Sequence, residues 1–209
     1  MKAFDIITET DARTLEIGSS VTLKPGGHVT PLAADTLKAR RITVHSGVAE
    51  ASLDGLAPVA PVRALAIGSD HGGVALKAAL REYLRQKGLR VLDVGTDGPE
   101  SVDYPDIAAQ AARLVARKEV DAAIVIDGAG IGSAIAANKI DGVRAAMCND
   151  KTLARYAREH NGANVLTLGA SLISLDDAKA IVDTWLATPM GEARYLRRLA
   201  KIRALEKTQ

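Results

Sequence analysis

The chain has 209 residues, of which 47% are hydrophobic and 25% are charged, and its formal net charge at pH 7 is +2. This balance excludes a dedicated nucleic-acid or membrane surface, and no apolar run reaches the roughly 20 residues of a membrane-spanning helix. The acidic start lacks the order of a signal peptide, and the single cysteine, Cys148, excludes an internal disulfide. We therefore expect a soluble, cytoplasmic protein.

The first 62 residues show no regular alternation of strands and helices. Residues 15–44 predict a short β segment, a Pro-Gly-Gly turn and one small helix with Thr30 as N-cap and Pro31 as its first residue. Residues 46–62 are small, contain proline and lack periodicity, which is typical of a linker. We expect an N-terminal extension over 1–45, a linker over 46–62 and the main domain over 63–209.

From residue 63 onward, short apolar runs alternate with segments of helical periodicity. The expected strands are 63–69, 90–96, 122–127, 143–149 and 164–170, and the expected helices are 70–88, 106–119, 133–140, 151–160, 175–188 and about 191–206. Strands that are apolar throughout are typical of a parallel sheet covered on both faces. The pattern predicts an α/β, doubly wound, Rossmann-like three-layer sandwich with a mostly parallel sheet of about five strands.

Ligands of such sheets bind beyond the carboxyl ends of the strands, where this chain carries polar and glycine-rich turns. Asp127 ends an apolar strand and begins the turn that contains Gly128, Gly130 and Gly132, although an unpaired buried carboxylate is costly. The turn departs from the dinucleotide fingerprint because Ser133 stands where its third glycine belongs. The dinucleotide fingerprint also has an acidic residue about 20 positions later, and Asp150 stands at that distance, so an NAD-dependent oxidoreductase remains a minor alternative.

Two histidines stand near ends of predicted elements. His71 follows Asp70 and precedes two glycines that open a helix, so it is either a phosphate contact or an exposed loop residue, while Asp70 suits an N-cap. His160 and Asn161 end another helix, where a cationic side chain compensates the helix dipole without further function.

Together these stretches resemble the type B ribose-5-phosphate isomerase and galactose-6-phosphate isomerase family. The resemblance is carried, in order along the chain, by "IGSDHGGVALK", "VLDVGTDGPESVDYPD", "DGAGIGSAIAANK", "REHNGANVLTLGA" and "ARYLRRLAKI". It covers about residues 63–205 and implies a metal-free, cofactor-free aldose–ketose isomerisation of a small sugar phosphate through an enediolate. It also implies a homodimer, or a tetramer built as a dimer of dimers, with sites shared between subunits.

The resemblance also implies roles for individual residues. Asp70 would hold substrate hydroxyls, His71 would face the phosphate, and His160, helped by Asn161, would assist ring opening. The amides of residues 128–132 would stabilise the enediolate oxygen. Arg194 and Arg198 would bind phosphate in a composite pocket with His71 that a neighbouring subunit completes; without the resemblance, the two arginines form a solvated basic helix face.

Four positions depart from the family pattern. Asp127 replaces the catalytic cysteine of one branch, Ser133 replaces the catalytic glutamate of another, Ala129 replaces a serine or threonine, and Ser171 replaces a phosphate-site arginine. The loss of one cationic contact and one hydroxyl points to a substrate other than ribose 5-phosphate. A non-catalytic sugar-phosphate-binding or scaffold protein derived from this family is the alternative.

Asp127 is our candidate for the general base that moves the proton between the two substrate carbons. Partial burial at a strand end is expected to raise its pKa above the usual value of about 3.9. The competing hypothesis is that Asp127 caps the helix that starts near Gly132 or binds a hydroxyl, in which case Asp70 is the next candidate for the base.

The extension carries a second resemblance. "VTPLAADTLKARRI" is similar to short segments that precede the catalytic domains of enzymes associated with bacterial microcompartments. Such a segment would direct the protein to a shell or cargo partner inside a microcompartment. The alternative is an extra helix that packs on the main domain.

Overall fold

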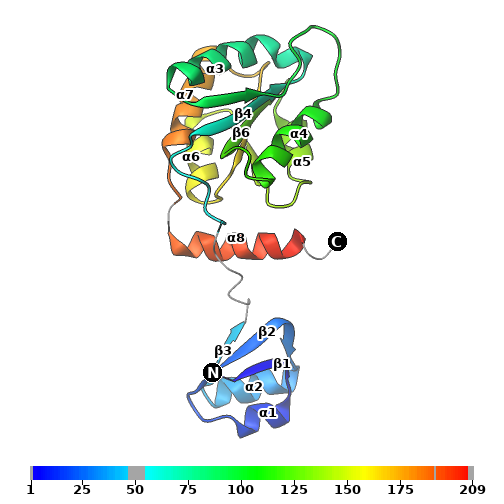
Figure 1. Cartoon of the computed structure of the whole chain (residues 1–209). Coiled ribbons are helices and arrows are strands. Elements are labelled where there is room, and N and C mark those ends of the chain that lie inside the picture. The colour runs from blue at the N-terminus through cyan, green and yellow to red at the C-terminus, as the bar shows by residue number, and fades with distance from the viewer. Residues whose placement is uncertain (1, 47–54, 191, 207–209) are drawn as a thin grey trace. The chain divides into compact units, whose positions relative to one another are not determined.

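The computed structural model describes residues 2–46, 55–190 and 192–206. The chain divides into two compact units, Met1–Leu53 and Asp54–Gln209, each with its own hydrophobic core (Figure 1). Of the expected linker, residues 47–54 lie outside the described residues. Residues 55–62 belong to the second unit, where the Leu56 side chain is buried, so the linker prediction is wrong for this part.

The N-terminal unit is a small α/β fold of its own. Its elements are β1 (Ala3–Ile7), α1 (Glu9–Thr14), β2 (Ser20–Val29), α2 (Pro31–Ala39) and β3 (Thr43–Ser46), and its three strands pair in parallel in the order β1-β2-β3. The sequence analysis anticipated β2 and α2 but missed β1, α1 and β3. The extension therefore contains more than the single extra helix of the alternative.

Local signals explain where the two helices of this unit begin. Thr8 and Asp11 form a capping box at α1, in which the Thr8 amide donates to Asp11 Oδ2 over 2.9 Å. Thr30 occupies the N-cap position of α2 and Pro31 its first turn, as predicted. The predicted Pro-Gly-Gly turn falls inside β2, where the pairing with β1 jumps from Phe4–Leu23 to Ile6–His28, so these residues interrupt the ladder without ending the strand.

The second unit confirms the predicted doubly wound fold. Its elements are β4 (Ala64–Ser69), the 3₁₀ turn η1 (His71–Gly73), α3 (Val74–Gln86), β5 (Arg90–Asp93), α4 (Tyr104–Ala116), β6 (Ala122–Asp127), α5 (Ile131–Ala137), β7 (Ala145–Met147), α6 (Lys151–Glu159), β8 (Val165–Gly169), α7 (Leu175–Ala187) and α8 (Ala193–Glu206). The five strands are all parallel, in the order β5-β4-β6-β8-β7. All carboxyl ends therefore lie at one edge of the sheet.

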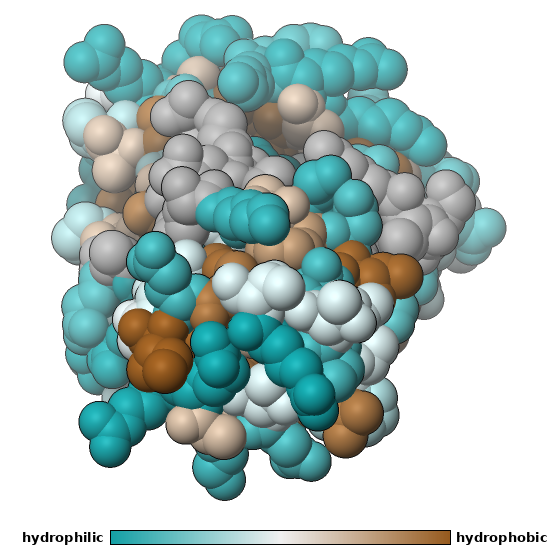
Figure 2. Space-filling model, turned by 90° about the horizontal axis from the view of Figure 1, so that it is seen from below, coloured by the Kyte–Doolittle hydropathy of each residue, from teal (hydrophilic) through white to brown (hydrophobic). Residues whose placement is uncertain are grey.

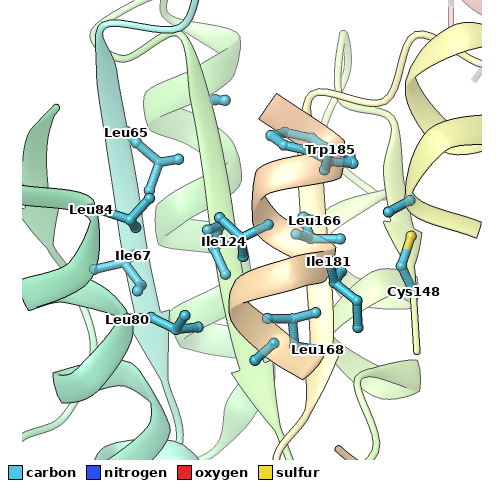
Figure 3. Packing of buried hydrophobic residues seen from close by; sticks show 14 of the residues in the cluster. Leu65, Ile67, Leu80, Leu84, Ile124, Cys148, Leu166, Leu168, Ile181 and Trp185 are labelled. Carbon is cyan, nitrogen blue, oxygen red and sulfur yellow. The ribbon is translucent and has the colours of Figure 1, made fainter. Parts of the chain in front are cut away.

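Helices cover both faces of this sheet and bury its strands (Figure 1). On one face α3, α6 and α7 pack over the strands, and on the other α4 and α5 do so. Figure 3 shows the first of these cores, in which branched aliphatic side chains of the strands (Leu65, Ile67, Ile124, Leu166 and Leu168) meet Leu80 and Leu84 of α3 and Ile181 and Trp185 of α7. Every residue of β4 and β6 is buried, which fixes the turns at their carboxyl ends.

Figure 2 shows a face on which hydrophilic side chains predominate and hydrophobic ones are scattered. Among the described residues, no helix combines the length and apolar character needed to cross a membrane.

The separate cores predict how fragments of the chain behave. A fragment of residues 54–209 should unfold in one cooperative transition, because the core of the second unit contains nothing from residues 2–46. A fragment of residues 63–209, the boundary suggested by sequence alone, loses the buried Leu56 side chain. We expect it to be less stable by about 2–4 kcal/mol in urea denaturation. Equal unfolding free energies for the two fragments would contradict this assignment.

Candidate active site

Asp127 is the last residue of β6, and its carboxylate organises the turn that follows. Oδ1 accepts hydrogen bonds from the amides of Ala129 (2.8 Å) and Gly130, and Oδ2 accepts from the amide (2.9 Å) and the hydroxyl (2.6 Å) of Ser133. Gly130 adopts a φ of 78°, which a residue with a side chain rarely adopts, and this conformation turns the chain back over the carboxylate. The buried charge is thus satisfied by four donors.

These donors also decide the pKa of Asp127. Burial raises it, but the hydrogen bonds from the Ser133 hydroxyl and from the amides of Gly130, Ser133 and Ala129 outweigh that effect, so the pKa lies below its ordinary value. The expectation of a raised pKa is therefore wrong. Asp127 is ionised at neutral pH and is a weak base.

The same bonds affect the expected enediolate site. Three backbone amides of the turn, those of Ala129, Gly130 and Ser133, donate to Asp127. The Ser133 amide belongs to the first turn of α5, which starts at Ile131. This is the arrangement of the competing hypothesis, in which Asp127 caps the helix. Proton transfer by Asp127 stays a prediction.

Asp70 and His71 lie next to this turn, because β4 and β6 are neighbouring parallel strands. The Asp70 amide donates to the Ile126 carbonyl over 3.1 Å, and Asp70 Oδ1 caps η1 by accepting from the amides of Gly72 and Gly73. His71 is exposed, and its Nδ1 accepts the Val102 amide over 3.4 Å. We call Asp70, His71, Asp127 and the turn over residues 128–133 the strand-end cluster.

Tyr104, which was not predicted to be near the site, packs against the strand-end cluster. Tyr104 begins α4, and its ring lies so close to Gly132 that a Cβ atom on Gly132 would come within 2.5 Å of the ring carbons. The signal was an aromatic residue directly before a proline at a predicted helix start. Ser171, which replaces the expected arginine, lies beside Gly128 at the same edge.

The remaining predicted residues gather elsewhere, around His160. The imidazole ring lies between the rings of Tyr156 and Tyr195, with centroid separations of 4.7 Å to each. Arg194 donates to the Tyr195 hydroxyl over 3.0 Å, and the Arg198 guanidinium lies 5.7 Å from the centre of the Tyr195 ring. Both arginines are exposed, and Asn161 donates to the Tyr156 carbonyl over 3.0 Å. We call His160, Asn161, Arg194, Tyr195 and Arg198 the helix-end cluster.

The two clusters lie at opposite edges of the sheet. His160 is the C-cap of α6, the helix that returns the chain to the start of β8, whereas Asp70 and Asp127 stand where β4 and β6 end. A strand of six residues spans about 20 Å. Arg194 and Arg198 therefore do not share a pocket with His71 of the same subunit, and the predicted pocket with His71 needs a neighbouring subunit; it stays a prediction.

Two other polar residues have structural roles. Asp150, which supported the NAD alternative, caps α6 by accepting the Leu153 amide over 2.9 Å. Burial raises the pKa of the Cys148 thiol to about 12, so this cysteine does not replace the family's catalytic one. Among the described residues, no cluster of three or more histidine, cysteine or acidic side chains is arranged to hold a metal ion.

Comparison with known proteins gives these clusters a family context. Residues 65–202 match the family model described as Ribose/Galactose Isomerase. The chain is 41% identical over 145 residues to the ribose-5-phosphate isomerase B of Escherichia coli, covering 69% of this chain and 97% of that protein. It is 42% identical over 123 residues to a D-erythrulose-4-phosphate isomerase of Pectobacterium atrosepticum, covering 58% of this chain and 81% of that protein.

A solved structure agrees with the sequence comparisons. The ribose-5-phosphate isomerase B of Clostridium thermocellum superposes with a TM-score of 0.68 at 48% identity, over 69% of this chain and 97% of that one. The family model leaves the whole N-terminal unit unmatched and ends within α8. The chain therefore belongs to the ribose/galactose isomerase family of aldose–ketose isomerases.

Proposed function

We propose that the protein interconverts an aldose phosphate and a ketose phosphate of four to six carbons through an enediolate, in sites that two subunits share. The observation that carries this proposal is the separation of the two clusters. The strand-end cluster holds two carboxylates, His71 and a glycine turn, and the helix-end cluster holds His160 and two exposed arginines, so neither cluster alone contains all the groups that the reaction would use. A second copy of the chain brings them together.

In the shared site each cluster has its own task. Asp70 holds substrate hydroxyls and His71 faces the phosphate. From the other subunit, Arg194 and Arg198 bind the phosphate through charge-assisted hydrogen bonds, and His160, with Asn161, assists ring opening. The stacking of His160 between two tyrosines supports this role, because it fixes the plane of the imidazole.

The substrate we propose differs from ribose 5-phosphate. Ala129 and Ser171 remove one hydroxyl and one cation from the strand-end cluster, and a relative of similar identity is named for a four-carbon substrate. The test is incubation of the pure protein with four- to six-carbon aldose and ketose phosphates in deuterated water. Deuterium should enter next to the carbonyl of one of them, and an inert panel would favour the non-catalytic alternative.

A homodimer, or a tetramer built from it, is the assembly we propose. Two elements beside the edge strand β7 present exposed apolar side chains, namely Ile131 and Ile135 on α5 and Leu153 and Tyr156 on α6. Burial of such side chains against a second copy would stabilise the pair.

A mixing experiment tests the shared site. Asp70→Asn and His160→Asn variants should each lose most activity, because each damages one cluster. When the two are mixed and allowed to exchange subunits, half of the dimers should be hybrids with one undamaged site, so about a quarter of the wild-type activity should return. If both clusters of a working site came from one chain, mixing would restore nothing.

The role of Asp127 is the second question at this site. We propose that Asp127 anchors the glycine turn and that it transfers the proton only after releasing Ser133. Asp127→Asn does not separate the two roles, since it places an amide NH₂ among amide donors and so damages the turn as well as removing the base. Ser133→Ala is more informative, because it leaves the carboxylate in place.

If Asp127 is the base, Ser133→Ala should raise its pKa by removing a donor, and the acid limb of the pH profile of kcat/KM should move to higher pH. If Asp127 is only an anchor, that limb should not move and the variant should merely lose about 1–3 kcal/mol of stability. The lowered pKa of Asp127 also makes the folding stability depend on pH. A lowered folded-state pKa stabilises the protein above the unfolded value of about 3.9, and this is lost as the pH falls through the folded-state pKa.

For the N-terminal unit we propose targeting or partner binding, including association with a microcompartment, in the cytoplasm. Two observations support this proposal. The unit has its own hydrophobic core, in which α1 and α2 pack against each other. On its strands, Thr22 is partly exposed and Thr43 and His45 are exposed, so these side chains are available to a partner. The 54–209 fragment should keep the kinetic constants of the whole chain. A fragment that folds but has lost activity would instead place this unit in catalysis.

A further inference from the structure

Residues 55–62, which we call the arm, lie before the family match and pack on the second unit. We propose that the arm holds α8 in position for phosphate binding, with Leu56 as the positioning residue for Arg194 and Arg198. This inference rests on the proposed function, which assigns phosphate binding to α8. It adds a part that the family model does not contain.

The first contact between the arm and α8 is apolar. Leu56 is 2% exposed and forms a small core with Leu199 (1%) and Ala200 (3%) of α8. Met190, just before α8, and Leu196 pack against this core. Leu56 thereby covers the buried face of α8 on which Leu199 and Ala200 lie.

The arm and α8 also meet at the turn after His160. A Cβ atom on Gly162 would lie 2.8 Å from Leu199 Cδ1, 3.4 Å from the Met190 sulfur and 3.4 Å from Pro58 Cδ. The arm, α8 and the turn between α6 and β8 therefore converge at one point. This point is two residues from His160, in the helix-end cluster.

Two arginines, Arg158 fully buried and Arg144 partly buried, fix the backbone of the arm. Arg144 Nη2 donates to the Leu56 carbonyl over 2.9 Å, and Arg158 Nη2 donates to the Val59 carbonyl over 3.0 Å. The Arg158 side chain has no exposed surface, and burial, together with the nearby Arg144, lowers its pKa to about 10. In the described part of the chain, the hydrogen bonds of both guanidiniums go to backbone carbonyls. The arm thus supplies acceptors to charges that are costly to bury unpaired.

Helix geometry links this contact to the phosphate residues. Tyr195 and Leu199 are four residues apart, so they lie on one face of α8, and both are buried. Arg194 and Arg198 each precede one of them and lie on the exposed side. A shift of α8 at Leu199 would therefore move both guanidiniums together.

The test uses Leu56→Ala in the full chain, with Leu56→Met as the conservative variant and Val59→Ala as the control. The Val59 side chain is 49% exposed, and its substitution keeps the carbonyl that accepts from Arg158. Amide hydrogen exchange of residues 193–206 should become faster in Leu56→Ala, while the exchange of β4 and β6 stays unchanged. With the best phosphate substrate, KM should rise about tenfold or more with little change in kcat, because a small displacement of a binding group costs affinity.

Leu56→Met and Val59→Ala should both keep the wild-type amide exchange of α8 and the wild-type KM. Unchanged exchange in α8, or faster exchange with an unchanged KM, would overturn the inference. If the wild-type protein isomerises no sugar phosphate, the proposed function fails by itself. Affinity for inorganic phosphate then replaces KM, and the arm inference fails if Leu56→Ala leaves either that affinity or the exchange of α8 unchanged.

Discussion

Strand direction is the constraint on which the account of the site depends. Because all five strands of the large sheet are parallel, their carboxyl ends carry Asp70 and Asp127 to one edge, and each connecting helix returns the chain to the other edge. His160, at the end of such a helix, is separated from Asp127 by the length of a strand. No side-chain rotation spans this distance, so a site that uses both groups requires a second subunit.

At the strand-end edge, the buried charge of Asp127 determines the local structure. Four donors surround its carboxylate, and three of them are amides of the turn that would otherwise face a ligand. The turn is therefore ordered by the protein's own anion. A substrate oxyanion has to use other donors or displace this carboxylate, and this distinguishes the turn from a simple phosphate-binding loop.

The sequence predicted the second unit well, because buried parallel strands and amphipathic helices have clear periodicities. It missed β1, α1 and β3 of the first unit, which are short and partly polar, although Thr8 and Asp11 carry a recognisable capping signal. The direction of the Asp127 pKa shift could not be predicted from the sequence, because it depends on how many hydrogen-bond donors the conformation of Gly130 directs at the carboxylate. The composition of residues 55–62 resembles a linker, and only tertiary packing reveals that Leu56 is buried.

The shared site is the central claim, and a crystal structure with a non-reactive sugar-acid phosphate bound tests it most directly. We expect the phosphate to contact Arg194 and Arg198 of one subunit and His71 of the other, with the carbon chain over the turn that begins at Asp127. A ligand whose phosphate is bound by residues of a single chain, away from either arginine, would contradict it.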